Sequence, residues 1–246
     1  MNYNIYFSPT DTTKKVVQHI GEKFTDNKNI DLSKSNLSNY IMNEDDFCII
    51  GVPSFGGRVP EIATIRLQQL KGNHTPVLLV VTYGGRAYED TLRELKDTVE
   101  KLGFICIGAT TLIAEHSIVS QIQTKRPNEK DYKELDAFIE IIKQRLQNIQ
   151  PITNIPGNYP YKEYKVLPMD VIASEACIKC GLCAQNCPVS AIPLENPKQI
   201  CMSCISCMRC INICPIKARQ VDPVKLETIS NKLKTICDPN KQNEFF

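Results

Sequence analysis

Twelve cysteines stand out among the 246 residues, because nine of them fall between Cys177 and Cys214. A disulfide-linked secreted protein spreads its cysteines along the chain, where they close loops. Cysteines crowded into one short segment instead indicate metal or cluster ligation in a reducing compartment. The other three, Cys48, Cys106 and Cys237, are scattered. We expect Cys48 and Cys106 to be small buried residues, because both lie in apolar runs.

The crowded cysteines form an internal repeat. Both copies follow the spacing C-x2-C-x2-C-x3-C-P, and they begin 27 residues apart, at Cys177 and Cys204. Three thiolates at this spacing wrap a loop around one [4Fe–4S] cubane, and the fourth cysteine of each copy reaches the other cluster. The first predicted ligand set is Cys177, Cys180, Cys183 and Cys214. The second predicted ligand set is Cys187, Cys204, Cys207 and Cys210.

Structural zinc explains this pattern less well, because zinc usually takes its four ligands as two separated pairs. Two details depart from a regular repeat. Cys201 adds a further cysteine, which we interpret as a spare thiol beside the site. Met208 stands where the first copy has Gly181, and glycine tolerates backbone conformations that methionine does not. The two cluster loops therefore need not be identical.

On these cysteines, residues 170–222 resemble the bacterial-type ferredoxins with two [4Fe–4S] clusters. The resemblance implies a small α+β domain that transfers single electrons. We place this ferredoxin-like domain at 169–223, after a proline-rich linker at 151–168. Residues 224–246 are expected to form a C-terminal tail or short helix.

Residues 1–150 alternate short apolar runs with stretches of helical period, a pattern typical of an α/β domain with a parallel sheet. We expect helices after Thr10, after Tyr88 and from about Asp131. Five strands with intervening helices complete a doubly wound domain. The five predicted strands are residues 4–7, 30–32, 47–52, 77–82 and 104–108.

Three loops follow the carboxyl ends of predicted strands, where open α/β sheets bind ligands. The first loop places hydroxyl groups before a helix, which suits a phosphate, although such residues also serve as ordinary helix caps. The other two pair glycines with an aromatic residue, as a planar ring held against the backbone requires, although Gly-Gly also forms plain turns. The candidate residues are Ser8, Thr10, Asp11, Thr12 and Thr13; Pro53, Ser54, Phe55, Gly56 and Gly57; and Thr82, Tyr83, Gly84, Gly85 and Tyr88.

These loops resemble those of the flavodoxin family, over about residues 1–150. The family's phosphate loop, T/S-x-T-G-x-T, corresponds to Ser8, Thr10 and Thr13, with Asp11 at the glycine position. A carboxylate there suits a phosphate only if it points to solvent. The resemblance implies bound FMN, with Phe55 and Tyr88 flanking its isoalloxazine ring. No G-x-G-x-x-G follows a strand, so a Rossmann-type nicotinamide site is not expected.

Taken together, the chain resembles a flavodoxin–ferredoxin fusion of anaerobic microbes. We expect a cytoplasmic electron carrier that exchanges electrons with redox partner proteins. The net charge of +2 comes without a basic block, which argues against nucleic-acid binding. The apolar strip at residues 77–81 is far shorter than the roughly 20 residues of a membrane span, and the first residues lack the pattern of a signal peptide.

Two other functions stay open. One is a flavin-dependent reductase or dehydrogenase that uses the clusters as an internal wire. The other is a flavin-free interaction domain that docks the ferredoxin on its partners. Homodimerisation stays open as well.

Overall fold

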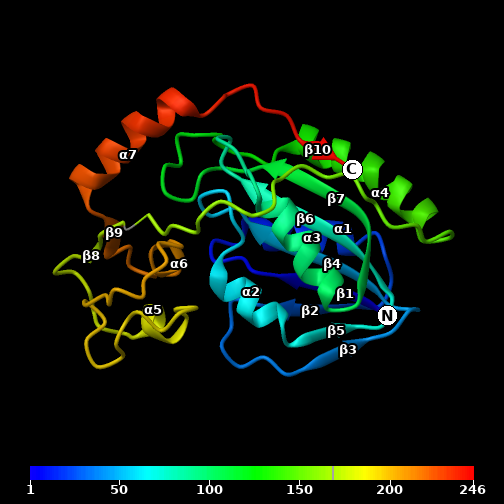
Figure 1. The fold of residues 1–246 in the computed structure, drawn as a ribbon. Coiled ribbons are helices and arrows are strands. Elements are labelled where there is room, and N and C mark those ends of the chain that lie inside the picture. Colours follow the sequence, from blue (N-terminus) through cyan, green and yellow to red (C-terminus); the bar gives the residue numbers. More distant parts are fainter. Residues whose placement is uncertain (168) are drawn as a thin grey trace.

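A parallel sheet forms the centre of the N-terminal domain. The computed structural model describes residues 1–167 and 169–246, and its main sheet has the strand order β10-β7-β6-β4-β1-β2 (Figure 1). The five parallel strands of this sheet are β1 (Asn2–Tyr6), β2 (Asn27–Asp31), β4 (Phe47–Pro53), β6 (Thr75–Tyr83) and β7 (Phe104–Ile113). Their order is that of flavodoxin-like doubly wound sheets, and all five predicted strands are confirmed.

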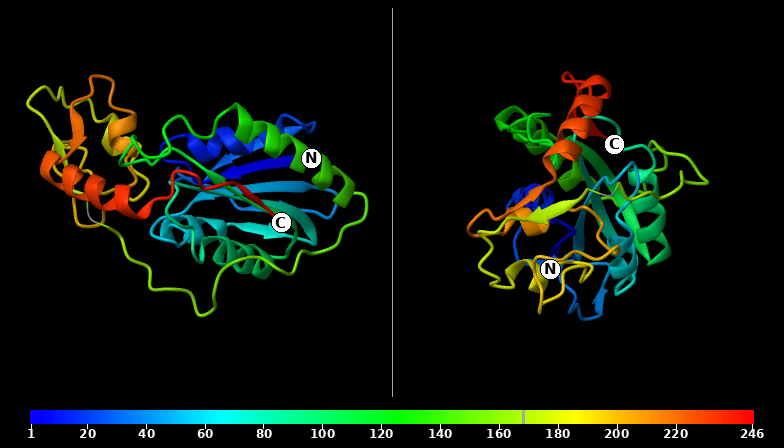
Figure 2. Two further views of the ribbon diagram at one scale, coloured as in Figure 1. Left: turned by 90° about the horizontal axis from the view of Figure 1, so that it is seen from above. Right: turned by 90° about the vertical axis from the view of Figure 1, so that its left-hand side faces the viewer.

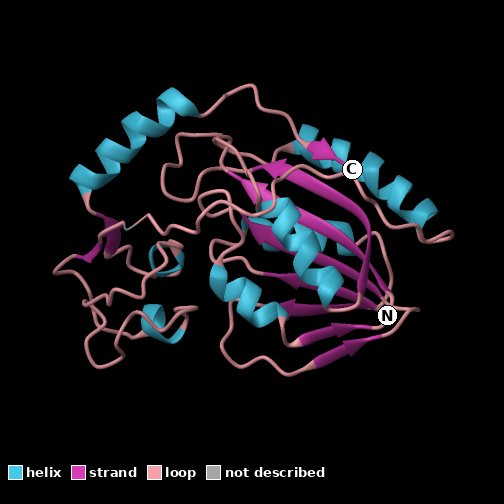
Figure 3. Cartoon of the chain, in the orientation of Figure 1, coloured by secondary structure: helices cyan, strands magenta, loops and turns pink. Residues whose placement is uncertain are grey.

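Helices cover both faces of this sheet (Figure 3). Helices α1 (Thr12–Gly21) and α4 (Glu129–Arg145) pack on one face, and α2 (Glu61–Leu67) and α3 (Thr91–Lys101) pack on the other. All nine residues of β6 are buried, as expected for a strand covered on both sides. The three predicted helices are confirmed. Helix α2 was not predicted, because its seven residues give little periodicity.

The central strands also bury two of the scattered cysteines. Cys48 and Cys106 are fully buried, as expected. A second, two-stranded sheet joins β3 (Tyr40–Met42) in parallel to β5 (Leu70–Gly72). Among the described residues, no helix combines the length and the apolar character needed to cross a membrane.

The segment predicted as a linker lies against the N-terminal domain over its described part, residues 151–167; Pro168 lies outside the described residues. The N–H of Ile152 donates a hydrogen bond to the carbonyl of Cys106 (2.8 Å), and Ile155 is buried in the core. The carboxylate of Asp90 accepts hydrogen bonds from the N–H groups of Asn158 (2.8 Å) and Lys162 (2.7 Å). These hydrogen bonds hold the segment against the N-terminal domain.

The C-terminal module is small. Strand β8 (Val171–Ala173) pairs antiparallel with β9 (Arg219–Val221), and two short helices, α5 (Leu182–Gln185) and α6 (Arg209–Asn212), follow cysteines of the two repeats. Helix α7 (Pro223–Ile236) begins after an Asp222 cap. Its buried apolar residues include the cluster Met169, Val171, Met208 and Val221, together with Ala191, Ile192 and Ala218.

The two repeats have left-handed backbone at equivalent positions, although Met208 stands where the first copy has Gly181. Met208 has a left-handed φ of 61°, close to the 76° of Gly181 at the equivalent position. Lys179 and Ser206 form a second equivalent pair with positive φ. A left-handed conformation costs a residue with a Cβ about 1–2 kcal/mol. Met208 is 4% exposed and packs in the module's core, so its burial offsets that strain.

Helix α7 covers the residues where a short helix was expected, and after it the end of the chain returns to the N-terminal sheet. After α7, strand β10 (Glu244–Phe245) pairs antiparallel with β7, and the Phe245 ring packs 5.1 Å from that of Phe138. The side chain of Asn243 donates hydrogen bonds to Asp131 and Glu134. Figure 2 shows the C-terminal module joined to the sheet twice, by the linker and by α7 with the tail.

Candidate functional site

A cavity of about 230 Å³ lies at the carboxyl ends of the parallel strands. Strands β1 and β4 are neighbours here, and the strand order reverses between them, which is the ligand-binding position of doubly wound sheets. Eleven of the fifteen residues predicted for a flavin site line this cavity. They are Ser8, Thr10, Thr12, Thr13, Pro53, Ser54, Phe55, Gly56, Thr82, Tyr83 and Gly84.

The first loop keeps the shape that a glycine would give it. Asp11 adopts a left-handed φ of 65°, and aspartate tolerates this region better than most residues. Its carboxylate is 49% exposed and lies 4.0 Å from the ammonium of Lys14. Asp11 is therefore absent from the cavity lining and its charge faces solvent, which is the condition that a bound phosphate requires. The hydroxyl of Ser8 accepts a hydrogen bond from the N–H of Lys14 (3.0 Å), which fixes the loop on helix α1.

Glycines bring the backbone of the other two loops close to the cavity. Gly56 has a left-handed φ of 61°. A Cβ on Gly84 would overlap the ring of His116. Gly57 and Gly85 lie outside the lining, where they pack against Glu89 and Gln123.

Tyr88 packs in the core and is absent from the cavity lining, whereas Phe55 lines the cavity. The Tyr88 ring contacts Tyr83 edge to face at 5.2 Å, and its hydroxyl donates a hydrogen bond to Glu244 of the tail. Burial is the main reason that the pKa of Tyr88 is raised. An aromatic residue missed by the sequence analysis, Tyr164, does line the cavity. It comes from the linker, where no periodicity pointed to it.

His116 forms part of the cavity wall as a neutral ring. Its Nδ1 accepts hydrogen bonds from the N–H groups of Ile118 and Val119, both at 3.2 Å. Burial lowers the pKa of His116 to about 4, because the charged ring would lose its hydration.

The second predicted ligand set gathers at one place, and we call it the proximal set (Cys187, Cys204, Cys207 and Cys210). All four cysteines line a single small cavity of about 20 Å³. Burial, together with neighbouring thiolates, raises the pKa of Cys207 to about 12 and that of Cys210 to about 11. Four thiols so close together, of which Cys207 is buried and the others are half-buried, are costly to ionise unless a cation binds them, and iron would supply that charge.

The first predicted ligand set, which we call the distal set (Cys177, Cys180, Cys183 and Cys214), is more exposed. The Sγ of Cys214 accepts a hydrogen bond from the N–H of Ala218 at 3.3 Å, and Cys187 accepts one from Ala191 at 3.2 Å at the equivalent position. Cys214 is only slightly buried, and several backbone N–H groups together hold its pKa below the usual range. Such donors suit a thiolate that ligates iron.

The two sets are neighbours, because the charge of Cys183 acts on the thiol of Cys210. In the described part of the chain, no three His, Cys, Asp or Glu side chains are gathered tightly enough to hold a single metal ion. A cubane needs a different arrangement, because each of its four irons takes one thiolate at a separate corner. Cys201 is exposed, and its N–H donates to the carbonyl of Ala191 (2.8 Å). Nothing in the structure assigns its thiol a role.

The larger cavity lies between the two modules. Its walls include Ile205, Ser206 and Cys207 from the proximal loop, and Ile229 and Leu233 from helix α7. Cys207 thus lines both the cavity at the strand ends and the small cavity of the proximal set. No sequence pattern placed the two modules in this contact.

Comparisons with known proteins agree with the C-terminal part. Models of a 4Fe-4S binding domain match residues 170–192 and residues 202–222, which cover both cysteine repeats. No curated protein matches the chain. Among solved structures, a flavodoxin from the domain Archaea is 13% identical, with 60% of this chain and 99% of that chain covered and a TM-score of 0.39.

A second solved structure, rubredoxin oxygen:oxidoreductase from the anaerobe Desulfovibrio gigas, is 16% identical, with 59% of this chain and 36% of that chain covered and a TM-score of 0.39. The fold assignment of the N-terminal domain rests on its own strand order. With that order and the two matched motifs, the chain is a flavodoxin-like domain joined to a ferredoxin-type region with two 4Fe–4S binding motifs.

Proposed function

We propose that this chain is an electron carrier, in which FMN in the larger cavity exchanges electrons with two [4Fe–4S] clusters and the clusters exchange them with redox partner proteins. The single observation that carries this proposal is the position of Cys207, which lines both the larger cavity and the cavity of the proximal set. A redox group in each cavity would share this residue as a wall. The proposal adopts the ligand sets and the FMN residues predicted from the sequence.

The residues of the larger cavity suit FMN in two ways. Thr10, Thr12 and Thr13 line it at the N-terminus of helix α1, where unpaired N–H groups and the helix dipole favour a phosphate. Phe55 offers an aromatic face, and the backbone at Gly84 can approach a ring closely. FMN, when bound, supplies a centre that accepts two electrons and releases them singly. The walls from helix α7 and the proximal loop would shield it from water.

The distal set suits the exit towards a partner. The side chain of Cys180 is exposed, and the neighbouring Ile178 is 64% exposed. None of the proximal cysteines is exposed. Electrons would therefore leave or enter through the distal cluster, while the proximal cluster connects it with the flavin.

The test is cofactor analysis of anaerobically purified or reconstituted protein. We expect about eight iron atoms per chain, from two four-iron sites, and one FMN, detected by quenching of flavin fluorescence. Cys180→Ala should halve the iron and leave FMN binding intact, whereas Cys201→Ala should leave the iron unchanged. Retention of eight iron atoms in Cys180→Ala would refute the ligand assignment, and zinc in place of iron would refute the cluster proposal.

One observation favours a second candidate, a flavin-free interaction domain. The cavity of about 230 Å³ is smaller than the roughly 300–1,000 Å³ of typical ligand pockets, and Tyr88 does not line it. An FMN titration distinguishes the two functions, because saturable binding with one flavin per chain supports the carrier. Absence of binding in protein with full iron content would establish the flavin-free alternative.

A further inference from the structure

Three arginines that form no ion pair with a carboxylate of the described residues lie in and beside the C-terminal module. They are Arg66 of helix α2, Arg209 of helix α6 and Arg219 of strand β9. Arg66 is 7% exposed and Arg219 is 3% exposed. In the described part of the chain, no carboxylate oxygen lies within the 4.0 Å of an ion pair with any of the three. Buried arginines are almost always paired with an anion.

Two of the three arginines leave buried donors without an acceptor in the described part of the chain. Arg66 donates from Nη1 to the carbonyl of Leu32 (2.7 Å) and from Nη2 to that of Pro188 (2.6 Å), the residue directly after Cys187. Arg219 donates from Nη2 to a backbone carbonyl, but its buried Nε and Nη1 have no acceptor, and neither has the buried Nε of Arg209. A buried donor without an acceptor is costly and implies a missing partner.

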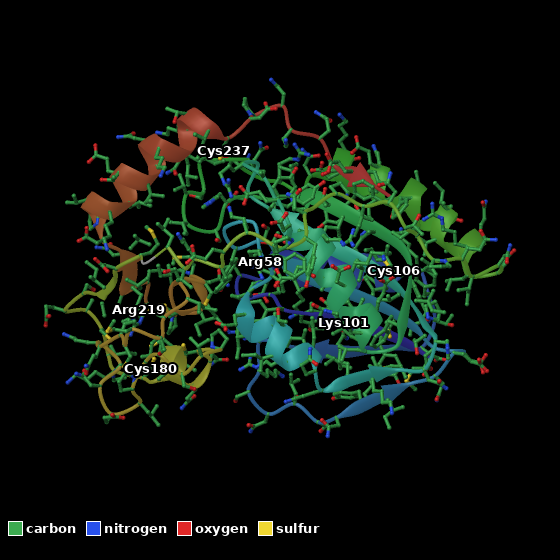
Figure 4. All side chains as sticks on the ribbon, viewed as in Figure 1. Arg58, Lys101, Cys106, Cys180, Arg219 and Cys237 are labelled. Atoms are coloured by element: carbon green, nitrogen blue, oxygen red, sulfur yellow. The ribbon has the colours of Figure 1, made fainter. Side chains whose placement is uncertain are left out.

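All three arginines lie around the proximal set. Arg209 lines the small cavity that the four proximal cysteines share. The charge of Arg219 acts on the thiols of Cys204 and Cys210. The charges of Asp31 and Cys187 both act on Arg66. Figure 4 shows Arg219 within the C-terminal module. The sulfurs of an anionic cluster at this place would supply acceptors for the unpaired donors of Arg209 and Arg219, and negative charge beside all three guanidinium groups.

The internal repeat gives the comparison with the distal set. At the positions of Arg209 and Arg219, the first copy carries Leu182 and Ile192. Arg66 comes from the N-terminal domain and has no counterpart in the repeat. The basic residue between the first two distal cysteines, Lys179, is exposed, so solvent and salt screen its charge.

We propose that Arg66, Arg209 and Arg219 are the counter-charge of the proximal [4Fe–4S] cluster and make it the more easily reduced of the two. An oxidised cubane with four thiolates carries about −2, and reduction adds one negative charge. A fixed positive charge in a poorly solvated site favours the added electron more strongly than an exposed lysine does. This inference rests on the two clusters of the proposed function and does not depend on the flavin.

The consequence is an order of reduction. One electron delivered to the fully oxidised protein would reside on the proximal cluster, beside the larger cavity. The distal cluster would be reduced second, at a more negative potential. The protein would thus hold its first electron inside and offer a more strongly reducing second electron at the exposed end.

An EPR-monitored redox titration of the anaerobic holoprotein tests the proposal, after the iron content of each variant has been measured. Arg66→Met removes a charge from outside the module, and Arg219→Ile introduces the residue of the first repeat. We expect each to make the midpoint of one cluster more negative, with a change of about tenfold in its reduction equilibrium, about 59 mV for one electron. The same titration in Cys180→Ala, which retains only the proximal cluster, assigns that midpoint. Arg66→Lys should retain the native value.

Lys179→Met is the matched control, because it removes a basic residue beside the distal cysteines, and both midpoints should change little. If Arg219→Ile loses iron, the test of the proposal rests on Arg66→Met, because Arg66 is not a cluster ligand and lies in the other domain. Eight iron atoms with unshifted midpoints in Arg66→Met would overturn the role of the arginines and leave the carrier proposal standing. Midpoints in the native protein that place the distal cluster higher would overturn the order of reduction. Native protein that holds neither cluster after anaerobic purification or reconstitution would refute the proposed function itself.

Discussion

The two modules of this protein are held together by different physics. The N-terminal domain buries long apolar strands between two layers of helices, and residues such as Ile50 and Leu79 are fully buried. Besides its cysteines, the described part of the C-terminal module buries few apolar side chains, such as Met169 and Met208, and it carries eight predicted ligand cysteines. A region with so little apolar burial needs another source of stability, and cluster binding can supply it. We infer that the first module folds by burial and the second by ligation.

The largest expected effect is the loss of the clusters. Removal of iron by a chelator should unfold residues 169–223, because the free energy of cluster binding is part of their free energy of folding. The N-terminal sheet should remain folded. Limited proteolysis and amide hydrogen exchange before and after chelation would show this difference. A module that keeps its exchange protection without iron would contradict it.

A smaller effect is expected from a cavity in the N-terminal core. Leu79→Ala removes a fully buried side chain from β6 and should cost about 2–5 kcal/mol of unfolding free energy. The measurement is the urea unfolding midpoint of the holoprotein, monitored by circular dichroism. The iron content should stay near eight per chain, and its loss at low urea would show that the two modules are energetically coupled.

An effect smaller than that of Leu79→Ala depends on pH and involves the returning tail. Asp131 is buried, which raises its pKa, but hydrogen bonds from Arg126, Asn128 and Asn243 outweigh burial and lower the pKa below its usual value. A carboxylate with a lowered pKa stabilises the folded state above its unfolded pKa of about 3.9. That stability is lost as pH falls through the folded pKa.

Asp131→Asn should therefore cost about 1–3 kcal/mol at neutral pH. It should also flatten the acid limb of the stability profile, measured as urea midpoints between pH 3 and pH 7. Lys133→Ala, which removes an exposed ion pair with Glu129, is the control and should change the unfolding free energy by less than about 1 kcal/mol. An unchanged acid limb in Asp131→Asn would contradict the lowered pKa assigned to Asp131.

The smallest expected effect concerns Met208. Met208→Gly relieves a left-handed strain of about 1–2 kcal/mol but removes a buried side chain worth about 1.5–3 kcal/mol. The loss of burial should outweigh the relief of strain, so the variant should release iron to a chelator somewhat faster than the native protein. Slower release would show that strain dominates, and that the second loop is held by its ligands and not by its packing.

The elements that could be predicted are those with a local signal. The β-branched runs of β4 and β6 predict buried strands, and the apolar stripe of α1, with Val16, Val17 and Ile20, predicts its helix. The missed elements carry little local signal. Helix α2 spans seven residues, and β10 spans two residues that form a strand only because β7 offers an open edge.

The residues of the candidate site divide in the same way, into those with a local sequence signal and those without one. Phe55 lines the larger cavity, as a loop residue after a strand was expected to do. Tyr88 follows the neighbouring strand but turns into the core, because Glu244 of the distant tail accepts its hydroxyl hydrogen. Tyr164 takes a place in the lining from a linker without periodicity. Contacts between segments so far apart leave no pattern in either segment alone.

The sequence by itself determined the order of the five parallel strands along the chain and predicted the grouping of eight cysteines into two ligand sets, because spacing and periodicity are local properties. Only the tertiary structure decided that Cys207 lines the larger cavity, that Arg66 reaches the carbonyl beside Cys187, and that the tail returns to the sheet. These contacts join residues far apart in the chain, and they arise from the packing of one module on the other.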